Sequence, residues 1–251
     1  MAVSSNSLFH YTDNLETLKS IIKEGFLLSY CLENSMAIPM ISFCDNPLSQ
    51  AKYFLDNYGN YAIGMNIDWG IKNKLNPVVY LEEKSYLSET LELAMNSMGF
   101  LHEYVDQKLD FKKRKEVKQV FSLQNFPMEI TRFSKPYRGK LVRNGTSIEN
   151  YKFYDEREWR YIPDSKQTYF PLGLIEPDYE EFKKENPTKP HFKENGLKFK
   201  ANDIKYIIIK NKNEVPNLID FLMNLDNLGT PQDIQLLFTR ILLAEQIIED
   251  I

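Results

Sequence analysis

The most chemically distinctive segment of the sequence is residues 154–161, YDEREWRY. If this segment is a strand, its two-residue period places Glu156, Glu158 and Arg160 on one face and Trp159 on the opposite, buried face. Glutamate is disfavoured in strands, so two on one face need a reason. One reason is a surface strand with cross-strand ion pairs. The other is a carboxylate pair in a cleft, where one orients a nucleophile and the other holds a ribose hydroxyl and stabilises positive charge on the sugar.

His10 belongs to a second candidate segment, Phe9-His10-Tyr11-Thr12, which reads as the end of a strand that runs into a capped helix. It is one of three histidines in the chain. A lone histidine is more often structural than functional. Its place at a strand-to-helix junction favours a functional role, because ligands approach sheets at such ends.

Ser42 and Cys44 lie in a third segment, residues 41–45, which precedes a helix that carries Tyr53. Cys44 is a nucleophile in chemical principle, but nothing in the sequence pairs it with a base. Cysteines in strands are usually small buried residues, so a structural role is favoured for Cys44.

The composition excludes several classes of protein. Hydrophobic residues make up 43% of the 251 residues and charged residues 26%, which suits a chain with a sizeable core and argues against disorder. No apolar run is long enough to span a membrane, and no secretory signal is visible. Two cysteines build neither a disulfide framework nor a zinc site. A net charge of −4 disfavours a general nucleic-acid coat protein. We expect a cytoplasmic protein without membrane association.

Hydrophobic periodicity predicts a mixture of strands and helices along the chain. The first helix should follow cap residues at 12–14 and end at Gly25. Residues 176–196 are predicted to be a loop. Strands are predicted at residues 8–11, 37–44, 61–67, 77–81, 128–134, 151–162 and 204–210, and further helices at 48–57, 215–224 and 230–250.

Residues 85–122 differ from the rest of the chain. Their apolar residues recur at helical spacing, and a charged stretch follows. We read them as a helical insert, in one long or two shorter helices, that packs on a sheet domain and borders the mouth of its cleft. The sequence therefore predicts a single α+β domain over residues 1–251, with this insert and C-terminal helices.

Three short motifs, in this order along the chain, resemble the ADP-ribosyltransferase superfamily. They are FHYTDNLETLKSIIKEGF from Phe9, AKY at 51–53, and the Glu-x-Glu of Glu156 and Glu158. The resemblance implies a split mixed or antiparallel sheet and NAD as substrate. It implies that a histidine and its neighbours bind NAD, that a tyrosine stacks on nicotinamide and that a late glutamate drives cleavage of the glycosidic bond. The chemistry passes through an oxocarbenium-like sugar, which a carboxylate stabilises.

Transferred residue by residue, the resemblance makes Glu158 the catalytic carboxylate and Glu156 the group that orients the acceptor. The residues that it assigns to NAD binding are His10, Tyr11, Thr12, Ser42 and Tyr53, with Tyr58 and Tyr61 as competitors of Tyr53. The Ser-Thr-Ser motif of the superfamily is missing, because Ser42 stands alone.

The sequence also resembles the AbiGi family of abortive phage resistance proteins over almost its whole length. The segments FCDNPLS and EREWRYIP carry the most specific part of this resemblance. It implies a role in bacterial defence against phage within a toxin–antitoxin pair, in which AbiGi carries the antitoxin label.

Two hypotheses follow. The first is an NAD-dependent ADP-ribosyltransferase or NAD-cleaving effector. The second is a non-catalytic antitoxin that binds a cognate toxin or a phage-derived protein. A nucleic-acid acceptor stays open for the enzyme, although no recognition motif supports it. The first hypothesis requires the side chains of His10 and Glu158 to lie on the order of 10 Å apart on one face of the sheet, because one nicotinamide riboside must touch both.

Overall fold

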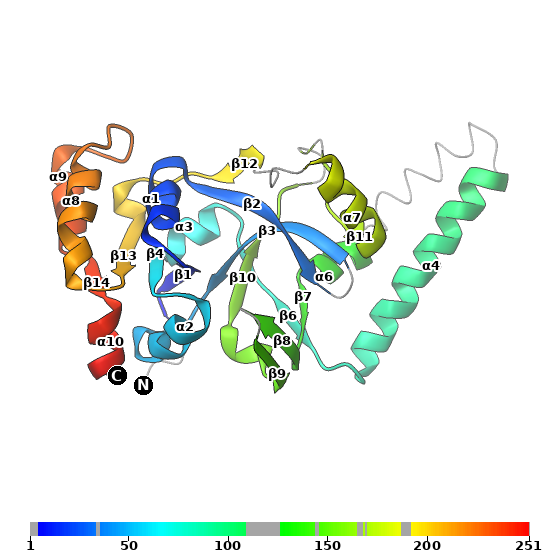
Figure 1. Ribbon diagram of the computed structural model, residues 1–251. Coiled ribbons are helices and arrows are strands. Elements are labelled where there is room, and N and C mark those ends of the chain that lie inside the picture. Colours follow the sequence, from blue (N-terminus) through cyan, green and yellow to red (C-terminus); the bar gives the residue numbers. More distant parts are fainter. Residues whose placement is uncertain are drawn as a thin grey trace. The chain divides into compact units, whose positions relative to one another are not determined.

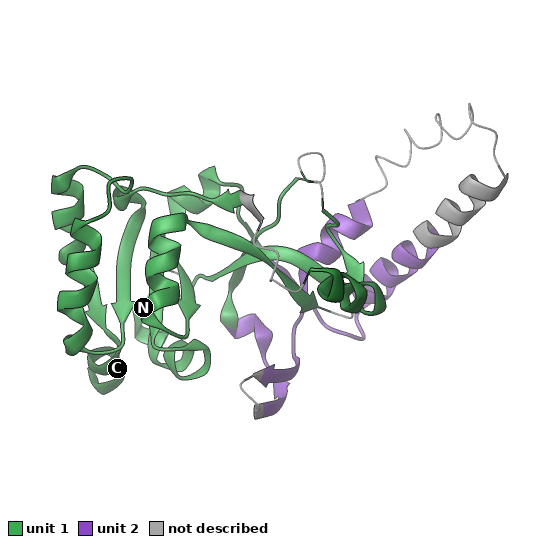
Figure 2. Ribbon diagram, turned by 45° about the horizontal axis from the view of Figure 1, so that its top comes forward, with its two compact units in different colours: residues 1–77, 156–251 green, residues 78–155 purple. Residues whose placement is uncertain are grey.

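A computed structural model describes residues 5–33, 36–108, 126–143, 146–164, 168, 170–186 and 192–250. The chain forms two compact units (Figure 2). Unit 1 comprises Met1–Pro77 and Glu156–Ile251, and unit 2 comprises Val78–Asp155. The predicted α+β class is confirmed. The prediction that residues 1–251 act as one domain stays a prediction.

Unit 1 is built on a mixed sheet whose main path runs β12-β2-β3-β1-β4-β13-β14 (Figure 1). Only the pairing of β13 with β14 is parallel among the described strands of this sheet. The strands on the path are β1 (Ser7–Thr12), β2 (Phe26–Glu33), β3 (Met36–Cys44), β4 (Tyr61–Asn66), β12 (Phe192–Leu197), β13 (Ile204–Ile209) and β14 (Ile241–Leu243). Off the path, β10 (Glu158–Tyr161) pairs with β3 and β5 (Asn76–Pro77), and β11 (Leu174–Ile175) pairs with β3.

The sheet separates between β1 and β3. Strand β1 pairs with β4 along its whole length, whereas its registered pairing with β3 is the single pair Phe9↔Cys44. Beyond this pair β3 continues instead against β2 and β10. The polar segments singled out in the sequence lie around this point of separation.

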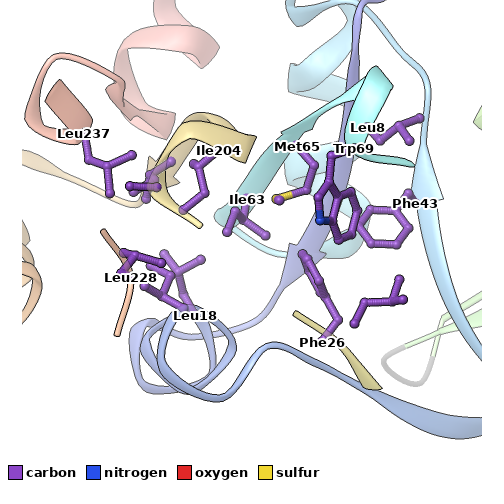
Figure 3. Packing of buried hydrophobic residues seen from close by; sticks show 14 of the residues in the cluster. Leu8, Leu18, Phe26, Phe43, Ile63, Met65, Trp69, Ile204, Leu228 and Leu237 are labelled. Atoms are coloured by element: carbon purple, nitrogen blue, oxygen red, sulfur yellow. The ribbon is translucent and has the colours of Figure 1, made fainter. Parts of the chain in front are cut away.

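Alternation along the central strands creates two hydrophobic cores, one on each face of the sheet. The larger core contains Leu8 and Ile207, and the smaller contains their neighbours Phe9 and Ile208. Figure 3 shows part of the larger core, in which Trp69 lies beside Phe26, Phe43 and Met65. Because adjacent residues of one strand enter different cores, the core that a side chain joins reveals the face on which it lies.

Helices cover both faces. Helix α1 (Leu15–Glu24) begins where the Asn14 side chain accepts from the Thr17 amide, and it ends at Gly25 with φ +83°, as the sequence predicted. It contributes to the larger core with α3 (Ile67–Lys72), α8 (Val215–Met223) and α9 (Pro231–Phe238). Helices α2 (Ala51–Tyr58) and α10 (Ala244–Asp250) contribute to the smaller core.

Unit 2 contains helices and small sheets of its own. Strands β6 (Val79–Leu81) and β7 (Ser134–Pro136) are parallel, and β8 (Gly139–Arg143) forms a hairpin with β9 (Thr146–Tyr151). Helix α4 (Tyr86–Lys108) packs on α6 (Phe126–Arg132). Residues 86–108 of the predicted helical insert form helix α4, and residues 109–122 lie outside the described part of the chain. That the segment at 85–122 is an insert stays a prediction.

Three predicted elements were wrong, and several elements were not predicted, among them strands β2, β8 and β9 and helix α3. Residues 128–134, which were predicted as a strand, lie mainly in helix α6. The predicted loop 176–196 contains helix α7 (Glu176–Glu185). Its first turn contains a proline, which is favoured at helix starts, and its acidic first turn and basic last turn suit the helix dipole. The predicted helix 230–250 is interrupted by β14, because its apolar residues pair with β13.

Candidate functional site

Glu158 takes part in a buried ion-pair network on β10. Register places Glu158 opposite Cys44 and Arg160 opposite Ser42, so all four side chains share one face. The Ser42 hydroxyl donates to Glu158 Oε1 at 2.7 Å. Arg160 donates to the same oxygen through Nε at 2.6 Å and to Oε2 through Nη2 at 3.3 Å. Arg160 Nη2 also lies 3.1 Å from Glu33 Oε1.

Burial makes this network costly to break. Arg160 is 0% exposed and Glu158 is 4% exposed. Burial lowers the pKa of Arg160, but the Glu158 and Glu33 carboxylates raise it more, so its pKa ends above the ordinary value. The sequence allowed either ion pairs or a carboxylate pair in a cleft, and for Glu158 the structure shows an ion pair. Unlike the expected surface pair, it is buried and joins two residues of the same strand.

Glu156 does not belong to the strand, which corrects the predicted two-residue period. It ends a turn of 3-10 helix (Phe153–Glu156), and Arg157 then adopts φ +47° before β10 begins. The turn is held by the residues after β3: Asp45 N–H donates to Arg157 O at 3.0 Å and Asn46 Nδ2 to Glu156 O at 3.0 Å. Hydrogen bonds thus join the segments FCDN and EREW directly. The part that Asn46 plays in holding this turn was not predicted from the sequence.

The buried Glu156 carboxylate accepts a hydrogen bond from the hydroxyl of Tyr58. Tyr58 ends helix α2, and its ring lies 6.3 Å from that of Tyr11. Burial and the neighbouring Cys44 raise the pKa of the Tyr11 hydroxyl. The structure therefore gathers Tyr11, Tyr58, Glu156 and Glu158 on the face of the smaller core.

The His10 side chain lies on the opposite face of the sheet, the face of the larger core. Its ring contacts Phe26 and Phe43, at centroid distances of 5.2 and 5.6 Å, and both belong to the larger core. Its Nδ1–H donates to Ser42 O at 2.8 Å. Burial lowers the pKa of His10, and the hydrogen bond to Ser42 opposes that shift. His10 and Glu158 thus both reach Ser42, through its carbonyl and its hydroxyl, but they approach from opposite faces.

Two further residues named from the sequence lie apart from this cluster. Tyr53 is 46% exposed on α2 and contacts Phe54 edge-on. Thr12 is the last residue of β1 and pairs with Tyr61. Tyr58, a competitor of Tyr53 in the sequence, is the tyrosine that reaches a carboxylate of the Glu-x-Glu motif.

The described residues contain no group of three or more His, Cys, Asp or Glu side chains that could hold a metal ion. No helix within the same part of the chain is long and apolar enough to cross a membrane.

Comparison with known proteins identifies the family. A family model described as "Putative abortive phage resistance protein AbiGi, antitoxin" matches residues 10–210, which include both the FCDN and EREW segments. The chain belongs to the AbiGi family. A relative from Lactococcus lactis subsp. cremoris, named "Abortive phage resistance protein AbiGi", is 31% identical over 233 aligned positions, and the match covers 85% of each chain. No solved structure matches. Family membership supports a part in phage defence.

Proposed function

We propose that this AbiGi protein is a non-catalytic antitoxin that binds a toxin protein through unit 2. The description of the matching family as an antitoxin supports a protein partner. The state of Glu158 also supports it. A carboxylate that is buried, held by Ser42 and neutralised by Arg160 is a structural group rather than one held ready for a sugar cation.

The observation that carries the proposal is the apolar surface of unit 2. On helix α4, Tyr86 is 84% exposed, and Leu87 and Leu93 are more than half exposed. Tyr86 and Leu93 are seven residues apart, about two turns of helix, so they lie on the same side of α4. Exposed apolar side chains that share one side of a helix are typical of surfaces that bind other proteins. Unit 2 is the smaller unit, yet it holds eight of the large hydrophobic side chains that are exposed in the described residues: Val79, Tyr86, Leu87, Leu93, Phe126, Val142, Ile148 and Tyr154.

Neutralisation of the toxin tests this proposal. Proteins encoded beside its gene are the candidates for the toxin, and each is co-expressed with wild type or with the Tyr86→Ser/Leu93→Ser double variant. Wild type should restore growth and the double variant should fail, because removing two apolar anchors weakens binding by several kcal/mol. Met223→Ser/Leu236→Ser removes two exposed apolar side chains from unit 1 and should still rescue. Equal rescue by all three proteins refutes a binding role for α4.

A second candidate is an NAD-dependent ADP-ribosyltransferase or NAD-cleaving effector. One observation favours it: Glu156, Glu158, Tyr11 and Tyr58 gather on one face beside the separation of β1 from β3. His10 lies on the face opposite Glu158, so the form of this candidate in which one nicotinamide riboside touches both residues is ruled out. What is left is NAD cleavage at the Glu-x-Glu face without a ribose contact from His10. Release of nicotinamide from labelled NAD tests it. This candidate requires turnover that falls about 10²-fold in Glu158→Gln, whereas the antitoxin proposal requires none in either protein.

A further inference from the structure

A cavity of about 410 Å³ lies in unit 1, on the side of the larger core. It is bordered by the C-terminal ends of α1 and α3, by residues 198–203 and by the loop that contains Asn227 and Leu228. Its volume falls in the range of small-ligand sites. None of the residues assigned to NAD from the sequence lines it, so it is separate from the Glu-x-Glu segment.

Positive charge is concentrated in this cavity. Its lining includes Lys23, Lys72, Lys198 and Lys200, against the single carboxylate of Asp203. That carboxylate accepts the Lys200 N–H at 2.8 Å and so closes a backbone turn. The chain as a whole has a net charge of −4, so the gathering of four lysines contrasts with the overall charge.

Structural roles account for part of this gathering. Lys23 and Lys72 lie in the last turns of α1 and α3, where a cation suits the helix dipole. The Lys198 ammonium donates to Glu24 O, and the Lys200 ammonium donates to Asn227 O at 2.8 Å. These bonds hold two of the amines at the cavity. Four lysine side chains that line one hollow repel each other through their charges, and a bound anion relieves that repulsion.

The remaining wall of the cavity is apolar. Half-buried Phe199 lines it together with Trp69 and Leu228, both of which belong to the larger core. Trp69 is fixed there because its Nε1–H donates to Lys198 O at 3.1 Å. A flat ring can pack on the Phe199 side while an anionic group meets the lysines.

We propose that this cavity binds a phosphate group joined to a flat ring, which is the chemistry of a nucleotide. Lysine binds phosphate as a point charge, and the apolar wall receives the base. The same chemistry comes from two sources, a free mononucleotide or the 5′-terminal nucleotide of a nucleic-acid strand. The inference does not rest on the antitoxin proposal, because all of its residues belong to unit 1.

Calorimetric titration of the full-length protein tests the inference. The probes are AMP, adenosine, inorganic phosphate and a short single-stranded RNA with and without a 5′-phosphate. AMP should bind more tightly than phosphate, and adenosine should bind at least about 10-fold more weakly than AMP. If the phosphorylated RNA exceeds AMP and its hydroxyl form does not, the strand end is the source. If AMP equals or exceeds the RNA, the free nucleotide is the source.

Charge-matched variants separate the cavity from general electrostatics. Lys23→Gln/Lys72→Gln should weaken AMP binding by about 10-fold or more. Lys210→Gln/Lys212→Gln removes the same charge from exposed positions outside the cavity and should leave binding within about two-fold. Thermal unfolding checks that both variants are folded. Absence of AMP and RNA binding, adenosine binding equal to AMP, or equal weakening by the two variants overturns the inference.

Discussion

Replacing Arg160 with methionine should lower the free energy of unfolding by about 3–5 kcal/mol. Arg160 is 0% exposed and makes two bonds to Glu158, at 2.6 and 3.3 Å, and one to Glu33, at 3.1 Å. Methionine fills much of the same volume but supplies no countercharge. The cost arises because the Glu158 carboxylate stays in the protein interior without its cation.

Urea denaturation monitored by tryptophan fluorescence measures this loss. Both tryptophans of the chain, Trp69 and Trp159, belong to unit 1, as does the network, so the signal reports on the affected unit. In a thermal scan the same loss corresponds to a fall in Tm of about 6–20 °C for a unit of this size.

A double variant supplies the control. Glu158→Gln/Arg160→Met removes the buried charge together with its partner and should be more stable than Arg160→Met alone. A loss below about 1 kcal/mol in Arg160→Met, or a double variant less stable than the sum of the single changes, refutes the view that this network stabilises the fold.

Three further changes test separate features of the structure. Gly59→Ala should destabilise the protein by about 1–3 kcal/mol in denaturation experiments, because Gly59 has φ +110° and an added Cβ would lie 2.4 Å from Thr12 O. Burial lowers the pKa of His10 below its ordinary value of 6.5, so at mildly acidic pH the unfolded chain binds a proton at His10 more strongly than the folded chain does. The free energy of unfolding should therefore fall as the pH is lowered from about 7 to about 5. His10→Phe should flatten that fall in matched urea titrations, and an unchanged slope contradicts the assignment. Trp159→Ala should cost about 2 kcal/mol, less than a fully buried tryptophan, because Trp159 is half-buried against the larger core.

Caps, glycines and apolar runs in the sequence predicted those elements whose conformation depends on residues close along the chain. The Asn14 cap and Gly25 bound helix α1, and the apolar run at 204–210 corresponds to strand β13, which is paired on both sides. Residues 241–243 show why other parts could not be predicted. They continue a helical pattern, yet they form a strand because β13 offers a parallel edge, which is a long-range contact.

The candidate site shows the same limit. The types and spacing of Glu156, Glu158 and Arg160 pointed to paired carboxylates, and these side chains are buried close to Ser42 and Tyr58. The period-two argument failed at Arg157, where a positive φ ends the strand geometry. The face of His10 could not be deduced, because it depends on where β3 separates from β1.

Neutralisation of the toxin by Glu158→Gln is the most direct test of the central claim, that the protein acts by binding a partner and not by chemistry at Glu158. The assay measures growth of cells that carry the toxin, at levels of folded antitoxin matched to wild type. The account predicts full rescue, because the glutamine side chain still bonds to Ser42 and Arg160 and unit 2 is unchanged. Loss of rescue by a folded Glu158→Gln protein, together with loss of nicotinamide release from NAD, would contradict it.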